Sequence, residues 1–177
     1  MKIFSTILLL SMIPILLSCF GRKEKFPVVP RVDLARYAGT WYEIARFPHS
    51  FEKGLVCVTA DYTLNRDGTI KVVNRGRKEG DRNKISEAKA SGRVPDPKDP
   101  ARLKVTFFWP FSADYYILEL DEKDYSYALV SSSSRDYLWI LSRTKILDEK
   151  IYSRLVKRAA DLGFETARLI RVEQNCE

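Results

Sequence analysis

The sequence predicts an all-β protein in which eight antiparallel strands close into an up-and-down barrel, with one C-terminal α-helix packed outside and a short ninth strand. Eight short runs rich in apolar and aromatic residues follow one another, separated by turn signals. No helical pattern intervenes between them, which argues against alternating βαβ units. Closure into a barrel would remove exposed strand edges. A two-sheet sandwich also accommodates eight short strands, so periodicity alone leaves it open.

The expected strands are bounded by proline and turn residues. Thr40–Phe47 stops at Pro48, and Leu55–Leu64 ends at the turn Asn65-Arg66-Asp67-Gly68, whose glycine can take positive φ. Prolines 95, 97 and 100 mark a longer loop. The remaining expected strands cover residues 69–77, 84–94, 102–109, 114–120, 125–131 and 137–143.

Helical spacing appears once, near the C-terminus, where apolar residues form one stripe at Ile151, Leu155, Ala159 and Leu162. Asp148 is placed to cap the start of this helix and Gly163 to end it. An apolar run from Ala167 to Val172 predicts the ninth strand, leading towards Cys176.

The N-terminus has the pattern of a signal peptide. Lys2 is followed by an apolar run from Ile3 to Leu17, which is too short for a transmembrane helix of ~20 residues. The residues Leu16-Leu17-Ser18-Cys19 resemble the bacterial lipobox, so we expect cleavage after residue 18 and acylation of Cys19, with palmitate as one of the acyl chains. The alternative is an ordinary signal peptide with an incidental cysteine. Residues 19–32 would form a lipidated tether, and residues 33–177 the folded domain.

The cysteine count agrees with acylation. Three cysteines in an exported chain leave one unpaired, unless Cys19 is used for the anchor. Cys57 and Cys176 then make an even pair in an oxidising compartment, and we expect a disulfide. Cys57 as a catalytic nucleophile is the alternative, but it would need a base, and His49 is the only histidine of the chain.

Charge and motifs exclude several classes of function. Removal of the signal peptide leaves 29 basic and 23 acidic side chains, a net charge of +6 that suits a domain held near anionic headgroups. The basic residues between Arg75 and Lys84 are expected on a solvated rim, because export removes the chain from cytoplasmic nucleic acid. We find no catalytic triad, phosphate loop or metal-ligand spacing, place His49 on a loop surface, and expect no enzyme, cofactor or metal.

The segment Gly39-Thr40-Trp41-Tyr42-Glu43-Ile44-Ala45-Arg46-Phe47 resembles the opening of lipocalins, especially the bacterial and apolipoprotein D branch, whose signature is Gly-x-Trp. Residues 135–143 resemble the later signatures of the family. The resemblance implies structural roles for Gly39, Trp41 and Arg143, with the guanidinium of Arg143 over the Trp41 ring where the barrel closes. It also implies the pairing of Cys57, early in the second strand, with Cys176 in the tail.

Period-two alternation nominates the cavity wall. If Trp41 points inward, so do Glu43, Ala45 and Phe47, and we expect Glu43 to be a carboxylate paired near the floor of the barrel rather than a ligand contact. Alternation does not choose between Tyr115 and Tyr116, and we include Tyr116. The candidate ligand-binding residues are Ala45, Val58, Ala60, Tyr62, Phe107, Tyr116, Tyr137 and Trp139.

Together these features predict a membrane-anchored lipocalin that carries or stores a fatty acid or lysophospholipid in the cell envelope, a form of lipid transport. Phe20 after the lipidated cysteine, where an aspartate would retain a lipoprotein in the inner membrane, favours the periplasmic face of the outer membrane. Two alternatives stay open: a lipocalin-form enzyme acting on a lipid, and a filled barrel that serves as a structural or interaction lipoprotein. A homodimer is also left open.

Overall fold

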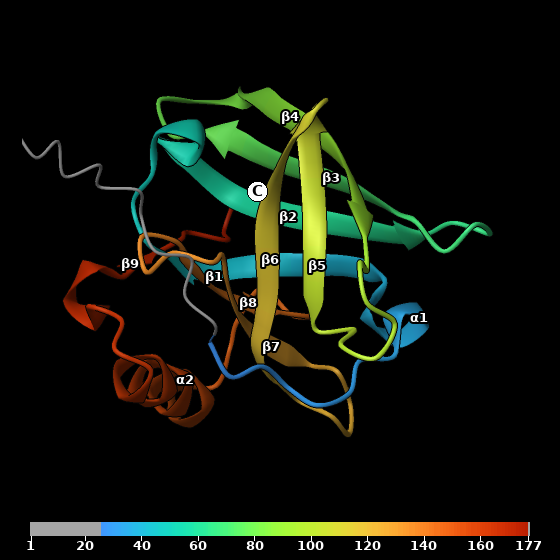
Figure 1. Cartoon of the computed structure of the whole chain (residues 1–177). Coiled ribbons are helices and arrows are strands. Elements are labelled where there is room, and N and C mark those ends of the chain that lie inside the picture. The colour runs from blue at the N-terminus through green and yellow to red at the C-terminus, as the bar shows by residue number, and fades with distance from the viewer. Residues whose placement is uncertain (1–25, 177) are drawn as a thin grey trace, which may run out of the picture.

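The computed structural model describes residues 26–176 (Figure 1), so the predicted signal peptide and Cys19 lie outside the described residues. Nine strands, two α-helices and two short 3₁₀ helices follow one another in this part of the chain. Their order is α1 (Leu34–Tyr37), β1 (Gly39–Arg46), η1 (Ser50–Glu52), β2 (Leu55–Leu64), β3 (Ile70–Lys78), β4 (Asp81–Arg93), β5 (Arg102–Phe108), β6 (Phe111–Leu120), β7 (Tyr127–Ser131), β8 (Leu138–Ser142), α2 (Glu149–Asp161), η2 (Thr166–Arg168) and β9 (Ile170–Arg171).

Strands β1 to β8 form a closed antiparallel barrel. Each strand pairs with the next along the chain, and β1 pairs with both β2 and β8, which closes the cylinder. The short strand β9 pairs with the end of β1, through Ala45 with Arg171 and Arg46 with Ile170. The predicted up-and-down barrel is therefore confirmed, and the sandwich alternative is wrong.

The two ends of the barrel differ in their connections. Helix α1 and the β2–β3, β4–β5 and β6–β7 connections lie at one end, which we call the closed end. The β1–β2 loop with η1 and the β3–β4, β5–β6 and β7–β8 connections lie at the other, which we call the open end. Strands β4 and β6 begin three residues earlier than predicted, at Asp81 and Phe111, so the open-end hairpins are longer than the apolar runs indicated.

Apolar side chains form two main clusters because the barrel wall has two buried faces. The inner cluster lies inside the barrel and includes Trp41, Ile117 and Leu141. The outer cluster lies between the wall and α2, where Leu138 and Ile140 meet Leu155 of the helix. Alternation along β8 divides its residues between the two clusters.

Helix α2 begins and ends as the sequence predicts. The side chain of Asp148 accepts hydrogen bonds from the backbone N–H groups of Lys150 and Ile151, which satisfies two of the free donors at the helix start. Gly163 follows the helix at φ +82°, a conformation that glycine adopts without a steric penalty.

A β-bulge in β1 overturns part of the predicted cavity wall. The pairing of β1 with β8 shifts between Glu43 and Ala45, so one extra residue enters the strand and the alternation changes phase. Ala45 and Phe47, predicted to face inward, instead belong to the outer cluster under α2. The prediction of Ala45 as a ligand-binding residue was therefore wrong. After the bulge it is Arg46, and not Ala45, whose side chain faces the interior.

Residues 26–32 are packed on the barrel rather than free as a tether. Phe26 is buried and stacks on Phe164 with ring centroids 5.0 Å apart, and the Val29 N–H donates to the Ile117 carbonyl. The expectation that the tether extends to residue 32 was therefore wrong, because two apolar side chains among charged residues and prolines are enough to fix this segment.

Candidate functional site: the barrel interior and its open end

The closed end has the predicted arrangement of Trp41 and Arg143. The guanidinium carbon of Arg143 lies 3.9 Å from the centroid of the Trp41 ring, and the indole N–H donates to the Tyr37 carbonyl at 2.9 Å. Arg143 also donates to the carbonyls of Arg36, Tyr37, Ala38 and Thr40. Gly39 has φ +96°, and a Cβ there would lie 3.3 Å from an Arg143 nitrogen. These three residues close the barrel and leave the chemistry to the other end.

Three tyrosine hydroxyls meet inside the barrel above this closure. The Tyr115 hydroxyl lies 2.7 Å from that of Tyr37 and 3.1 Å from that of Tyr62. Burial raises the pKa of all three phenols, that of Tyr62 to about 12. The cluster therefore stays protonated and offers hydroxyl groups within an apolar wall.

The structure resolves the choice that alternation left open in β6. Tyr115 and Ile117 face the interior, whereas Tyr116 and Leu118 belong to the outer cluster, with the guanidinium carbon of Arg102 at 4.8 Å from the Tyr116 ring centroid. The candidate Tyr116 was therefore wrong, because both faces of this strand are apolar and periodicity carries no information there.

A buried group of charges lies towards the open end. Arg46 donates to the Glu43 carboxylate at 2.5 Å and to the backbone carbonyls of Glu52 and Leu55. Its Nε lies 3.8 Å from the Glu52 carboxylate, which also accepts from the Trp139 indole at 3.3 Å. Glu43 is paired as predicted, but the pair lies towards the open end rather than at the barrel floor, and no motif marked Arg46 or Glu52 as its neighbours.

The two carboxylates differ in their electrostatics. Burial, reinforced by the charge of Glu52, raises the pKa of Glu43 well above its ordinary value despite the pairing with Arg46. Burial also opposes ionisation of Glu52, but the hydrogen bond and charge of His49 outweigh it and lower the Glu52 pKa. The site therefore combines Glu43, whose carboxyl loses its proton only at a raised pH, with Glu52, whose carboxylate is favoured in the ionised form.

Aromatic rings surround this charged group. The His49 ring stacks on Phe51 at 3.8 Å between centroids and lies 5.4 Å from Trp139, and its Nε2 is 3.0 Å from the Glu52 carboxylate. Tyr137 stacks on Trp139 at 6.0 Å with an interplanar angle of 12°. The expectation that His49 lies on a loop surface was wrong, since its side chain is 5% exposed. Residues 26–176 contain no group of three or more His, Cys, Asp or Glu side chains suited to a metal.

The other candidate wall residues lie in different surroundings. Ala60 and Tyr62 pack with the inner cluster. Val58 packs with Leu55 and Val172 in a separate small cluster. Phe107 lies near the tip of the β5–β6 hairpin and is 39% exposed.

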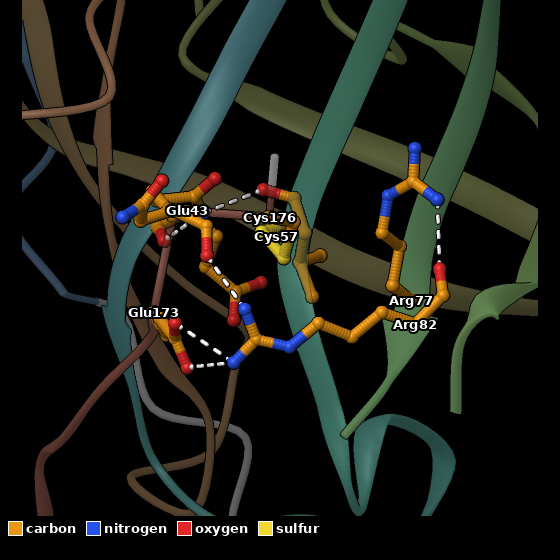
Figure 2. Close-up of a disulfide and its surroundings, with 9 residues drawn as sticks. Glu43, Cys57, Arg77, Arg82, Glu173 and Cys176 are labelled. Carbon is orange, nitrogen blue, oxygen red and sulfur yellow. Dashed lines mark hydrogen bonds and ion pairs between the residues drawn. A yellow bond between two sulfur atoms is a disulfide. The ribbon is translucent and has the colours of Figure 1, made fainter. Parts of the chain in front are cut away.

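The C-terminal tail seals a gap in the wall between β1 and β2. These strands pair only from Gly39 to Tyr42, and beyond that point the Gln174 amide donates to the carbonyls of Glu43 at 2.7 Å and Val58 at 3.0 Å. The predicted disulfide is confirmed: Cys57 and Cys176 are bonded, with their Cα atoms 6.2 Å apart. Figure 2 shows this bond beside the ion pair of Arg82 with Glu173, which holds the tail to β4. Sequence reasoning missed the role of Gln174.

Known proteins resemble the chain over most of its length. The chain is 42% identical to the outer membrane lipoprotein Blc of Vibrio cholerae, over 88% of this chain and 91% of that protein. It is also 42% identical to the Blc protein of Escherichia coli K12, over 83% and 82%, and 37% identical to apolipoprotein D of Rattus norvegicus, over 88% and 85%. The solved structure of insecticyanin from Manduca sexta superposes with a TM-score of 0.68 at 22% identity, covering 85% of each chain, which supports the fold.

These relatives bear on two further predictions. Lipocalins of this kind are binding proteins, which confirms on family grounds the prediction that the chain is not an enzyme. The relatives named outer membrane lipoproteins agree with the predicted location. Neither helix in the described part of the chain is long and apolar enough to cross a membrane. Residues 32–174 match the model of the lipocalin-like domain, and with relatives this similar the chain belongs to the lipocalin family.

Proposed function

We propose that the chain is an outer-membrane lipocalin, anchored through acylated Cys19, that binds a lysophospholipid or fatty acid in its barrel. Residues 1–18 serve as the signal peptide in this proposal, and the tether comprises residues 19–25. The names of the bacterial relatives and the lipobox-like residues before Cys19 support the anchor.

The observation that best supports a lipid ligand is the division of the interior into two zones. Apolar residues such as Val72, Leu103 and Ile117 line the part near the closed end, where burial of an acyl chain would contribute ~0.8 kcal/mol per methylene. The buried charges and aromatic rings lie nearer the open end, where a headgroup would remain. Such a zoned interior suits an amphiphile with one chain.

The composition of the headgroup zone favours an amine-bearing lysophospholipid over a free fatty acid. Two carboxylates, Glu43 and Glu52, face one guanidinium, Arg46. Trp139 and His49 stand beside Glu52, and an ammonium group is attracted both by a carboxylate and by aromatic faces. The carboxylate of a fatty acid would instead lie beside the Glu52 carboxylate, whose pKa is lowered, and like charges repel.

Titration of the delipidated chain beginning at Phe20 tests this function. We expect saturable tryptophan-fluorescence changes with lysophosphatidylethanolamine and at least ~10-fold weaker binding of a fatty acid of equal chain length, a difference of ~1.4 kcal/mol. Glu52→Gln should reduce that preference, with Glu87→Gln, an exposed carboxylate of β4, as the matched control. Absence of binding by every single-chain lipid would contradict the proposal and favour a filled interaction barrel. Native mass spectrometry of the same samples would show the ligand mass and whether a homodimer forms.

A further inference from the structure

The tip of the β5–β6 hairpin exposes an unusual amount of aromatic surface. Phe108, Trp109 and Phe111 are 80%, 90% and 78% exposed, and Phe107 below them is 39% exposed. Large rings are ordinarily buried, and an exposed group of them marks a contact with another apolar phase. The barrel core does not use these side chains.

Charge is absent from this tip. Residues 105–113 contain no Asp, Glu, Lys or Arg, and the first charged pair below the tip is Lys104 of β5 with Asp114 of β6. An uncharged run of this kind can enter the acyl-chain region of a bilayer without burying a charged side chain in hydrocarbon. Tryptophan in particular favours the boundary between lipid and water. The adjacent β3–β4 hairpin adds Arg77, Lys78, Arg82 and Lys84 against Glu79 and Asp81, a small basic excess at the same end.

The described N-terminal segment, from Phe26 to Asp33, runs along the outside of the barrel. Phe26 stacks on Phe164 and lies beneath Arg135, whose guanidinium carbon is 5.1 Å from the ring centroid. Arg135 belongs to the β7–β8 loop at the open end, whereas Asp33 donates to the Tyr125 hydroxyl in the β6–β7 connection at the closed end. The chain therefore runs from the side of the barrel that carries the β7–β8 loop towards α1.

The length of chain before Phe26 limits the distance to the membrane. Cys19 lies seven residues upstream, and seven residues span at most about 25 Å. An anchor so short keeps the open end of the barrel near the bilayer surface.

We propose that the β5–β6 hairpin tip inserts into the bilayer surface beside the acyl anchor, so that the mouth of the barrel faces the membrane. This docking rests on the proposed anchor, and it gives the bound lipid a path between bilayer and barrel that avoids bulk water. In this proposal the aromatic tip contacts a phospholipid surface. Burial of the tip against a second copy of the chain would contradict it.

Vesicle partition of the chain beginning at Phe20 tests the tip without the anchor, since the described barrel and its core begin at Phe26. The vesicles contain phosphatidylethanolamine and phosphatidylglycerol. The triple variant Phe108→Ser, Trp109→Ser, Phe111→Ser should partition at least about ten-fold less than the unsubstituted chain. Ile146→Ser is the matched control, because Ile146 is 84% exposed but lies between β8 and α2, beside Ile44 and Val172 rather than on the β5–β6 hairpin. Equal partition of the triple variant and the control would overturn the proposal.

Depth-dependent quenching by brominated lipids locates the tip directly. Trp41 is fully buried, so quenching that disappears in Trp109→Phe while vesicle binding persists would place Trp109 in the bilayer. If brominated lipids do not quench Trp109 in the acylated, membrane-bound chain, the proposal is overturned. Concentration-dependent protection of Trp109 without vesicles would overturn it in favour of a dimer. The triple variant should keep its affinity for monomeric lysophosphatidylethanolamine, which separates failure of docking from failure of ligand binding.

Discussion

Arg143 lies over Trp41 with its guanidinium carbon 3.9 Å from the ring centroid, and the same guanidinium donates to backbone carbonyls at the end of α1 and at the start of β1. One side chain from the end of the last barrel strand therefore fixes the start of the first strand and the helix that precedes it. The contact joins the two ends of the cylinder where closure requires them to meet.

Arg143→Lys should destabilise the barrel although it keeps the charge. An ammonium group cannot lie flat on Trp41 and reach several carbonyls together, and loss of charge-assisted hydrogen bonds costs roughly 2 kcal/mol. Trp41→Ala should cost ~3–5 kcal/mol as a truncation of a fully buried ring. Urea unfolding measures both, with the exposed Arg66→Lys as a control. An unchanged midpoint for Arg143→Lys would show that the contact does not stabilise closure.

The order of elements was predictable because each has a local signal. Pro48, the turn ending in Gly68, the cap Asp148 and Gly163 all bound elements as the sequence indicated. The pairing of Cys57 with Cys176 followed from the cysteine count and the family resemblance. The proline, glycine and capping positions each depend on the residue type at one position, so they can be recognised in the sequence without knowing the tertiary contacts.

The lining of the interior was less predictable because alternation fails at one extra residue. The bulge after Glu43 moved Ala45 and Phe47 outward and Arg46 inward, and no glycine or proline between Thr40 and Phe47 marks such a bulge. Tyr115 and Tyr116 were indistinguishable because apolar side chains cover both faces of that strand, those of the outer cluster on one side and those of the inner cluster on the other. Phe26 and Val29 were assigned to the tether because a packed segment without periodicity resembles a free one.

The two tyrosines at positions 115 and 116 should respond differently to loss of the hydroxyl. Tyr115→Phe removes hydrogen bonds to the Tyr37 and Tyr62 hydroxyls inside the barrel, so we expect ~1–2 kcal/mol of destabilisation and altered lipid affinity. Tyr116→Phe changes an outward-facing residue and should alter neither quantity beyond ~0.5 kcal/mol. Urea unfolding and lipid titration of the pair would check this. An equal effect of both substitutions on affinity would contradict the assigned faces of β6.

Removal of the disulfide should loosen the seam between β1 and β2. The bond joins residues 119 apart in sequence, for which the entropy of the unfolded chain gives up to about 5 kcal/mol. The double variant Cys57→Ser, Cys176→Ser should lose part of that stability, and hydrogen exchange should rise first at Cys57, whose N–H donates to the Glu173 carbonyl. Reductant should lower the melting temperature of the unsubstituted chain and leave that of the double variant unchanged.

The buried carboxyl of Glu43 should make stability fall as pH rises above the acidic range. Its pKa is raised in the folded state by burial and by Glu52, so the folded chain binds more protons than the unfolded chain between the two pKa values. Its contribution is complete below the unfolded pKa of about 4.3 and is lost as pH rises through the folded value, with a slope of at most ~1.4 kcal/mol per pH unit. The pKa of Glu52 is lowered in the folded state, so its contribution to stability is lost as pH falls below the unfolded pKa, outside the range in which Glu43 acts.

Glu43→Gln separates this contribution from those of Arg46, Glu52 and His49, which face the same site. Glutamine resembles the protonated carboxyl at all pH values, so the variant should gain stability relative to the unsubstituted chain as pH rises from 5 to 8. Urea midpoints of both proteins across that range give the difference directly, because titration of the shared neighbours largely cancels. A difference independent of pH would show that Arg46, whose guanidinium is 2.5 Å from Glu43, keeps this carboxylate ionised throughout.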